Sequence, residues 1–284
     1  MGNLYIETKE IMKKNGINAD KNLGQNFLVN EEVLNKIIEE SNICSEDLII
    51  EIGPGLGNLT KKILERAGKV ICIELDKRMI NILEKRFSDY KTFKLINNDV
   101  LKENLKELIK QEKKETNVKS VKVVANLPYY ITTPIIMKLL EERLDIDSIT
   151  VMVQKEVADR LTAIPGKAET GAITYTINYF TNATKIINVP NTSFIPEPKV
   201  ESSVIMLKKL EQPRVKVKNE EILFKVIKLA FMQKRKTLVN ALTNGNFASK
   251  EKIENMLNSL EIDLKIRGEK LTLEQYAQIA NFEI

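Results

Sequence analysis

A regular alternation of short apolar runs with amphipathic stretches constrains the fold most strongly. The apolar run Asp47–Ile52 ends in Gly-Pro-Gly-Leu-Gly, which is typical of a buried strand that enters a glycine turn and then a helix. Strands that alternate with helices form a mostly parallel sheet with helices on both faces, so an α/β fold is predicted. The further strands are expected at about 69–75, 92–97, 121–126 and 148–154, with an antiparallel edge from 184–189 and 202–207.

Beyond residue 207 the pattern changes to helices only, which predicts a second, small all-α domain. We therefore divide the chain into domains at 1–207 and 208–284. The second stretch carries 15 Lys and Arg against 10 Asp and Glu, whereas the rest of the chain carries 29 of each. The net charge of +5 thus resides in the helical domain, which favours attraction to a polyanion such as nucleic acid. A solvated lysine-rich surface is the alternative interpretation.

The composition excludes several classes of function. There is no histidine, which removes histidine-dependent triads, imidazole acid–base catalysis and nearly all catalytic zinc sites. Cys44 and Cys72 lack metal-ligand spacing, so no metal is expected. No apolar run approaches the length of a membrane span, and the start, Met1–Glu7, has no basic region followed by an apolar one, so a cytoplasmic location is expected.

Four strand ends carry residues suited to a nucleoside ligand, which binds beyond the carboxyl ends of parallel strands. Gly53 and Gly55 follow the first strand, and Glu74 ends the second, 21 residues after Gly53, where a carboxylate can accept both ribose hydroxyls. Asp99 ends the third strand and can accept from an exocyclic amine. Taken singly, each residue also fits an ordinary strand-to-helix turn. The turn lacks the last glycine of the dinucleotide fingerprint, which weakens a nicotinamide-dependent oxidoreductase as an interpretation.

The fourth strand ends in Asn126-Leu-Pro-Tyr, whose chemistry is more specific. The N6 amine of adenine is a poor nucleophile because the ring delocalises its lone pair. The Asn126 side-chain oxygen and the Leu127 carbonyl could hold its two hydrogens and aim the lone pair at a methyl donor. Pro128 removes a competing N–H donor, and Tyr129 offers a ring for stacking. A plain Asn-Pro turn packed by tyrosines is the structural alternative.

Together these motifs resemble the class I S-adenosylmethionine-dependent methyltransferases. More closely, the chain is similar to the ribosomal RNA adenine N6,N6-dimethyltransferase family, over nearly its whole length. The resemblance rests on Leu23-Gly-Gln-Asn-Phe-Leu28, Glu51-Ile-Gly-Pro-Gly-Leu-Gly57, Ile73-Glu-Leu-Asp76, Asn98-Asp99, Asn126-Leu-Pro-Tyr129, Gln154-Lys-Glu-Val157, Phe194-Ile-Pro-Glu-Pro-Lys-Val200 and Ala230-Phe-Met-Gln-Lys-Arg-Lys-Thr237.

The resemblance implies a Rossmann-like methyltransferase sheet, S-adenosylmethionine as the cofactor, and an N-terminal segment, residues 1–30, that closes over it. The implied cofactor site comprises Asn26, Leu28, Gly53, Gly55, Glu74, Leu75, Asp99, Val100 and Asn126. Asn126, Leu127, Pro128 and Tyr129 would hold the target base, with Phe194 stacked on its other face. For Phe194, a loop hydrophobe that caps the core is the alternative. Lys234, Arg235, Lys236 and Lys155 would contact RNA phosphates; for Lys155, an exposed lysine at a helix start is the alternative.

The implied reaction is dimethylation of N6 of two adjacent adenosines in a 3′-terminal hairpin loop of 16S ribosomal RNA. The implied partner is that RNA in the small (30S) ribosomal subunit or its precursor, met by a monomer. Two alternatives share the fold: an erythromycin-resistance type of methyltransferase that modifies 23S ribosomal RNA, and an inactive ribosome assembly factor. Asn-Leu-Pro-Tyr, the chain length and the Ala230–Thr237 motif favour the small-subunit enzymes.

Overall fold

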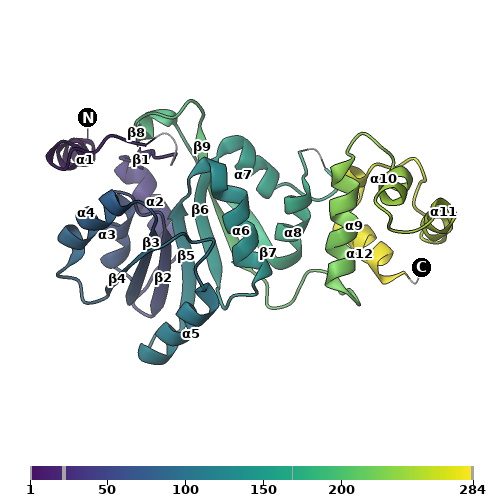
Figure 1. Ribbon diagram of the computed structural model, residues 1–284, viewed down its shortest axis with the longest axis horizontal. Coiled ribbons are helices and arrows are strands. Elements are labelled where there is room, and N and C mark those ends of the chain that lie inside the picture. The colour runs from purple at the N-terminus through teal and green to yellow at the C-terminus, as the bar shows by residue number, and fades with distance from the viewer. Residues whose placement is uncertain (1, 21–23, 168, 283–284) are drawn as a thin grey trace. The chain divides into compact units, whose positions relative to one another are not determined.

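The computed structural model describes residues 2–20, 24–167 and 169–282, and the chain forms two compact units (Figure 1). The first unit takes in the chain up to Ala158 together with Thr184–Lys209. The second takes in Asp159–Ala183 and the chain from Leu210 onward. Among the described residues, no helix is long and apolar enough to cross a membrane.

A seven-stranded sheet with the order β4-β3-β2-β5-β6-β9-β7 is the main sheet of the described residues (Figure 1). Neighbours from β4 to β6 are parallel, and β9 runs antiparallel to β6. The predicted mostly parallel sheet with an antiparallel edge is therefore confirmed. The strands are Asp47–Ile52 (β2), Lys69–Glu74 (β3), Phe93–Asn97 (β4), Ser120–Asn126 (β5), Ser148–Gln154 (β6), Thr181–Val189 (β7) and Ser202–Lys209 (β9).

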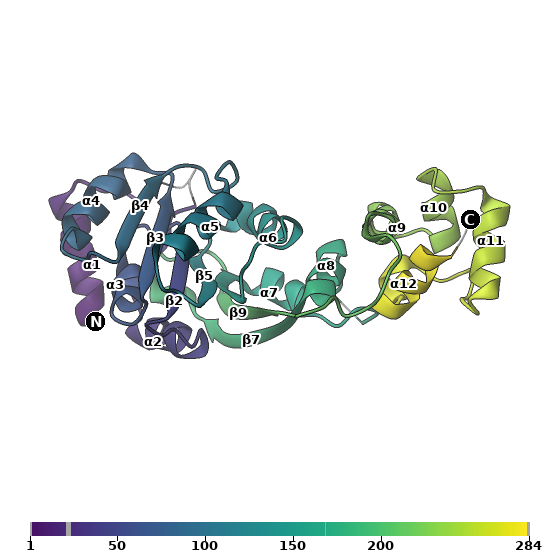
Figure 2. The ribbon, with the colours of Figure 1, turned by 90° about the horizontal axis from the view of Figure 1, so that it is seen from below.

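Helices pack on both faces of this sheet, and all six residues of β2 are buried as a result (Figure 2). Capping side chains set where several helices begin. The Asn30 side chain accepts from the Val33 N–H, and the Asp76 side chain accepts from the Arg78 N–H. The helices are Asn3–Lys14 (α1), Glu31–Glu40 (α2), Asn58–Leu64 (α3), Lys77–Phe87 (α4), Leu105–Glu115 (α5), Thr132–Glu141 (α6) and Lys155–Leu161 (α7).

A short antiparallel pair ties the N-terminal segment to a later part of the first unit. β1 (Phe27–Leu28) pairs with β8 (Phe194–Ile195), so that Leu28 lies opposite Phe194. The Asn58 amide, at the start of α3, donates to the Leu28 carbonyl and to the Thr8 hydroxyl of α1, both at 2.9 Å. The N-terminal residues are thus fixed to the helix that follows the glycine turn.

The second unit is helical and packs around aromatic side chains. The Tyr175 ring lies 5.0 Å from the Tyr276 ring and 5.4 Å from that of Phe231, centroid to centroid. Asn219, Thr237, Ser249 and Thr272 cap its last four helices, as the sequence pattern favours. The helices are Ala172–Phe180 (α8), Glu220–Met232 (α9), Leu238–Asn244 (α10), Lys250–Ser259 (α11) and Leu273–Asn281 (α12).

The second unit includes α8, which the division at residue 207 assigned to the first domain. The reason is packing: the Tyr179 ring of α8 lies edge-on to Phe224 of α9, with centroids 5.4 Å apart. The Tyr179 hydroxyl also donates to the Glu220 carboxylate at 2.8 Å. These contacts join α8 to helices that lie later in the sequence.

Candidate active site

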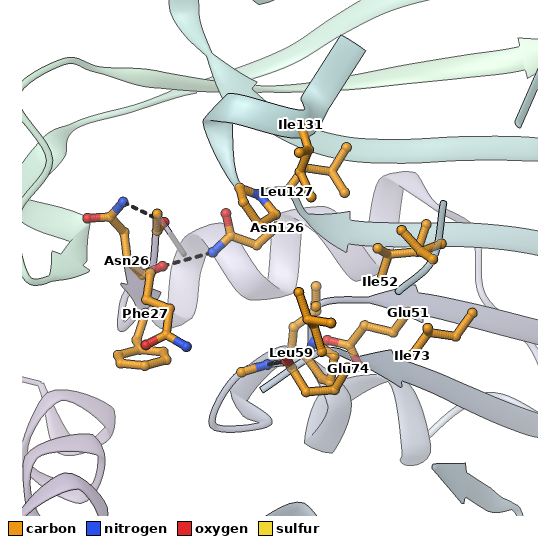
Figure 3. A pocket seen from close by; sticks show the side chains of 18 of the residues that line it. Asn26, Phe27, Glu51, Ile52, Leu59, Ile73, Glu74, Asn126, Leu127 and Ile131 are labelled. Atoms are coloured by element: carbon orange, nitrogen blue, oxygen red, sulfur yellow. Dashed lines mark hydrogen bonds between the residues drawn. The ribbon is translucent and has the colours of Figure 1, made fainter. Parts of the chain in front are cut away.

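A cleft, partly open to solvent, lies beyond the carboxyl ends of the central parallel strands (Figure 3). Residues from the ends of β2, β3, β4 and β5 line it, together with the N-terminal segment around β1. Leu23, the first residue of that segment's motif, lies outside the described residues. The predicted cofactor and target-base residues on the cleft wall are Asn26, Leu28, Gly53, Gly55, Glu74, Leu75, Asp99, Val100, Asn126, Leu127, Pro128 and Tyr129.

The glycine turn after β2 brings bare backbone to the cleft. Gly53 and Gly55 both lie in the left-handed region, at φ 67° and 57°, which side chains disfavour. A Cβ atom at Gly55 would stand 3.2 Å from the Phe27 ring of β1. One at Gly57 would stand 2.5 Å from Phe87 of α4, closer than packing allows. Glycine is therefore required both by the turn and by the side chains packed against it.

Glu74, at the end of β3, presents a fixed carboxylate. One carboxylate oxygen accepts from the Gly55 N–H at 3.1 Å, and the other accepts from the Asp76 N–H at 2.9 Å. Burial raises the pKa of Glu74, although these N–H donors favour the charged form. Because each carboxylate oxygen has further acceptor capacity, the group can take two more donors, such as the hydroxyls of a ribose.

A polar and an apolar part of the wall lie beside Glu74. Asp99 follows β4, and its carboxylate accepts from the Leu101 N–H at 3.0 Å. Val100 is buried, whereas Leu75 is about half exposed, and both line the cleft. A carboxylate beside two aliphatic side chains suits an aromatic ring that carries an amine.

Asn126, the last residue of β5, is held by the N-terminal segment. Its side-chain nitrogen donates to the backbone carbonyl of Asn26 at 3.0 Å. Figure 3 shows this bond, with the Asn126 side-chain oxygen turned away from Asn26. The amide therefore has its acceptor left over for a ligand in the cleft.

The residues after Asn126 continue this arrangement. The Leu127 N–H donates to the Met152 carbonyl of β6 at 3.2 Å, and Leu127 lines the cleft. The Tyr129 hydroxyl lies 2.7 Å from the Ser202 hydroxyl, which anchors the tip of that ring. Burial raises the pKa of Tyr129, so its phenol stays protonated at neutral pH. The cleft wall thus carries the Asn126 amide and the Leu127 residue beside the ring of Tyr129.

Phe194 and the predicted RNA-contacting cations lie elsewhere. Phe194 is only 2% exposed, packs in the core, and is absent from the cleft wall. The Lys155 ammonium lies 2.6 Å from the Glu201 carboxylate. The three exposed cations Lys234, Arg235 and Lys236 follow α9 in the second unit. The base-stacking role of Phe194 stays a prediction from resemblance, since in this structure the ring belongs to the core.

Comparison with known proteins places the chain in a family. The sequence profile of the family described as "Ribosomal RNA adenine dimethylase" matches residues 16–284. The chain belongs to this dimethylase family. The predicted family, enzyme class and fold class are thereby confirmed, and a nicotinamide-dependent oxidoreductase is ruled out as an interpretation.

Individual relatives agree with the assignment to the dimethylase family. The chain is 46% identical to a ribosomal RNA small subunit methyltransferase A of Alkaliphilus oremlandii, covering 97% of this chain and 95% of the relative. One from a Geobacillus species is 47% identical over 96% and 94% of the two chains. The crystal structure of a dimethyladenosine transferase from Plasmodium falciparum aligns with a TM-score of 0.74 at 30% identity, covering 89% of this chain and 95% of that chain. The 23S rRNA methyltransferase ErmE, at 22% identity and a TM-score of 0.68 over 89% and 98% of the two chains, shares the fold.

Several residues of this dimethylase cleft were not singled out from the sequence. Glu51 is fully buried beside Cys72, whose thiol donates to its carboxylate at 3.4 Å, and burial raises the pKa of Glu51 to about 7. Tyr130 is 55% exposed on the cleft wall, and Gln25 bonds to Asp76. Of these residues, only Glu51 had a sequence signal that indicated a place in the cleft, namely its position just before the glycine turn. The described residues contain no group of three or more metal-ligating side chains arranged around one point.

Proposed function

We propose that this protein transfers methyl groups from S-adenosylmethionine to N6 of two adjacent adenosines in a 3′-terminal hairpin loop of 16S ribosomal RNA. The observation that carries the proposal is the Asn126 amide, which Asn26 fixes with its oxygen available to the cleft that also holds Glu74. The family supplies the reaction class, and the names of the relatives support the small ribosomal subunit as the substrate.

The residues of the cleft fit S-adenosylmethionine. The Glu74 carboxylate, fixed by two N–H groups, would accept the ribose hydroxyls, and Asp99 would accept from the adenine amine. Leu75 and Val100 would contact the adenine ring, and the bare backbone of the glycine turn leaves room for the methionine part. The N-terminal segment with Asn26 and Leu28 would cover the cofactor. When bound, S-adenosylmethionine supplies an electrophilic methyl group.

The acceptors of the chain would prepare the target amine. The Asn126 oxygen and the Leu127 carbonyl would each accept one N6 hydrogen, which favours a pyramidal nitrogen whose lone pair points at the methyl group. Pro128 offers no N–H that would compete, and the Tyr129 ring would stack on the base. No strong base is needed, because the proton can leave to water once the nitrogen is cationic. For the second transfer, one hydrogen position must hold a methyl group instead.

The second unit and Lys155 would position the RNA. Lys234, Arg235 and Lys236 are exposed after α9 and would contact phosphates, which fix orientation without reading sequence. The target adenosine must be unpaired or turned out of its stack to enter the cleft. We expect a monomer that acts on the small subunit or its precursor in the cytoplasm.

The test is transfer of labelled methyl from S-adenosylmethionine to small subunits that lack this modification, with large subunits and naked 16S RNA in parallel. Nucleoside mass spectrometry should find dimethyladenosine only in the small-subunit RNA. Label in large-subunit RNA would instead support the erythromycin-resistance type. Tight binding to small subunits without any transfer would support an assembly factor.

A further inference from the structure

The Gln25 side chain links the N-terminal segment to the residues that follow β3 by hydrogen bonds. Its side-chain nitrogen donates to the Asp76 carboxylate at 2.8 Å, and its side-chain oxygen accepts from the Asp20 N–H at 2.9 Å. One side chain therefore uses both halves of its amide, as a donor toward Asp76 and as an acceptor toward the preceding loop. Neither a carboxylate nor an ammonium could do both at neutral pH.

The charges around Gln25 strengthen this contact. The Arg78 guanidinium lies 2.6 Å from the Asp76 carboxylate and 3.8 Å from that of Asp20. Burial alone would raise the pKa of Asp76, but hydrogen bonds from Arg78 and Gln25 hold it below its ordinary value. Asp76 is therefore an anionic acceptor at neutral pH, and a hydrogen bond to such a group is worth more than a neutral one.

The Gln25–Asp76 hydrogen bond is connected both to Glu74 and to Asn126. On one side, the Asp76 N–H donates to the Glu74 carboxylate, the group assigned to the ribose. On the other side, the residue next to Gln25 is Asn26, whose carbonyl accepts from the Asn126 amide. A displacement of Gln25 would move this carbonyl. The Asn126 amide would then be free to rotate and present its N–H₂ group, a donor, to the amine it must accept from.

We propose that Gln25 is a positioning residue for methyl transfer, which fixes the Asn26 carbonyl and through it the orientation of the Asn126 amide. The inference rests on the proposed function. On this proposal the N-terminal segment helps to orient the target amine, in addition to covering the cofactor.

The test uses Gln25→Glu, because protonation can restore the missing donor. At about pH 8 the new carboxylate would face that of Asp76, whose N–H donates to Glu74, and would lie near Asp20. Among the described residues, Arg78 is the cation paired with both Asp76 and Asp20. We expect kcat to fall about 10- to 100-fold, the loss of one hydrogen bond to a charged group. As the pH falls toward about 5.5, the protonated acid can donate to Asp76 and still accept from the Asp20 N–H, so kcat relative to the parent should recover.

Two further variants distinguish a positioning role of Gln25 from an unspecific effect of the substitution on the protein. Gln25→Ala should lose a similar factor in kcat and show no recovery in acid. Gln111→Glu is the matched control, because the Gln111 side chain also donates to a carboxylate, that of Glu115 at 2.8 Å, on the exposed surface of α5. It should keep the parental kcat over the whole pH range. The KM for S-adenosylmethionine should change less than kcat in both Gln25 variants.

The outcomes are distinguishable. If the parent transfers methyl and Gln25→Glu keeps parental activity at about pH 8, or stays impaired in acid where the parent is active, the positioning role is wrong and the proposed function stands. If the parent itself transfers no methyl group to small subunits, the proposed function fails and the inference fails with it.

Discussion

The buried Glu51 carboxyl leads to a prediction about stability and pH. Its side chain, on β2, is buried beside the Cys72 thiol of β3. Burial, with a further contribution from the nearby charge of Glu74, raises its pKa from 4.5 to about 7. In the folded protein without ligand, the Glu51 carboxyl should therefore be protonated below neutral pH. Above neutral pH this buried carboxyl ionises, which costs folding free energy. The substitution Glu51→Gln keeps the shape of the side chain and removes that titration.

The pH dependence of the unfolding free energy that Glu51 causes follows from proton linkage. A folded-state pKa above the unfolded value gives stability that is fully present below about pH 4.5 and is lost as the pH rises through about 7. With 1.36 kcal/mol for each pKa unit, the loss amounts to roughly 3 kcal/mol in total, of which about 2 to 3 kcal/mol falls between about pH 5 and pH 8. Relative to the parent, the variant should therefore gain about 2 to 3 kcal/mol of unfolding free energy over that interval.

Hydrogen exchange of the β2 and β3 amides, followed by mass spectrometry at several pH values, measures this difference where the group lies. Other titrating groups are common to both proteins and cancel in the comparison. Glu65→Gln, which removes an exposed carboxyl at the end of α3, is the control and should shift the free energy by at most about 0.5 kcal/mol at every pH. A difference between parent and Glu51→Gln that stays constant from about pH 5 to pH 8 would refute the reasoning.

Three further variants test the cleft and the basic segment. Asn126→Ala should abolish methyl transfer and leave the calorimetric affinity for S-adenosylmethionine nearly intact; an equal loss of both would make Asn126 structural. Glu74→Ala should weaken cofactor binding by about 10- to 100-fold, as expected for lost hydrogen bonds to a charged group, and unchanged affinity would remove it from the ribose role. Neutralising Lys234, Arg235 and Lys236 together should weaken RNA binding and flatten the slope of log K against log salt by about 2. A parental slope would place the RNA surface elsewhere.

The sheet and the strand ends were predictable because they depend on local pattern. Asp47–Ile52 is an apolar run followed by glycines, and the structure has β2 over those residues. Parallel strands end at the same edge, so Glu74, Asp99 and Asn126 had to lie near each other once the alternation was recognised. No three-dimensional information was needed for that step.

The orientation of individual side chains and their hydrogen-bond partners far away in the sequence were not predictable in the same way. Tyr129, Tyr130 and Phe194 look equivalent as aromatic platforms, but the first is anchored to Ser202, the second is exposed and the third is buried opposite Leu28. Gln25 and Asp76 are 51 positions apart, and no spacing rule pairs them. The helix α8 was missed because it is short and because two of its polar residues, Thr174 and Thr176, are buried with its apolar ones.

The path of the chain between β6 and β7 has a consequence for recombination between homologous genes. The chain leaves the first unit after Ala158, contributes α8 to the second, and returns at Thr184. A crossover near residue 208 would therefore combine the α8 of one parent with the α9 and α12 of another, against which Tyr175 and Tyr179 pack. Functional chimaeras should be those that carry 159–183 and the C-terminal helices from the same parent.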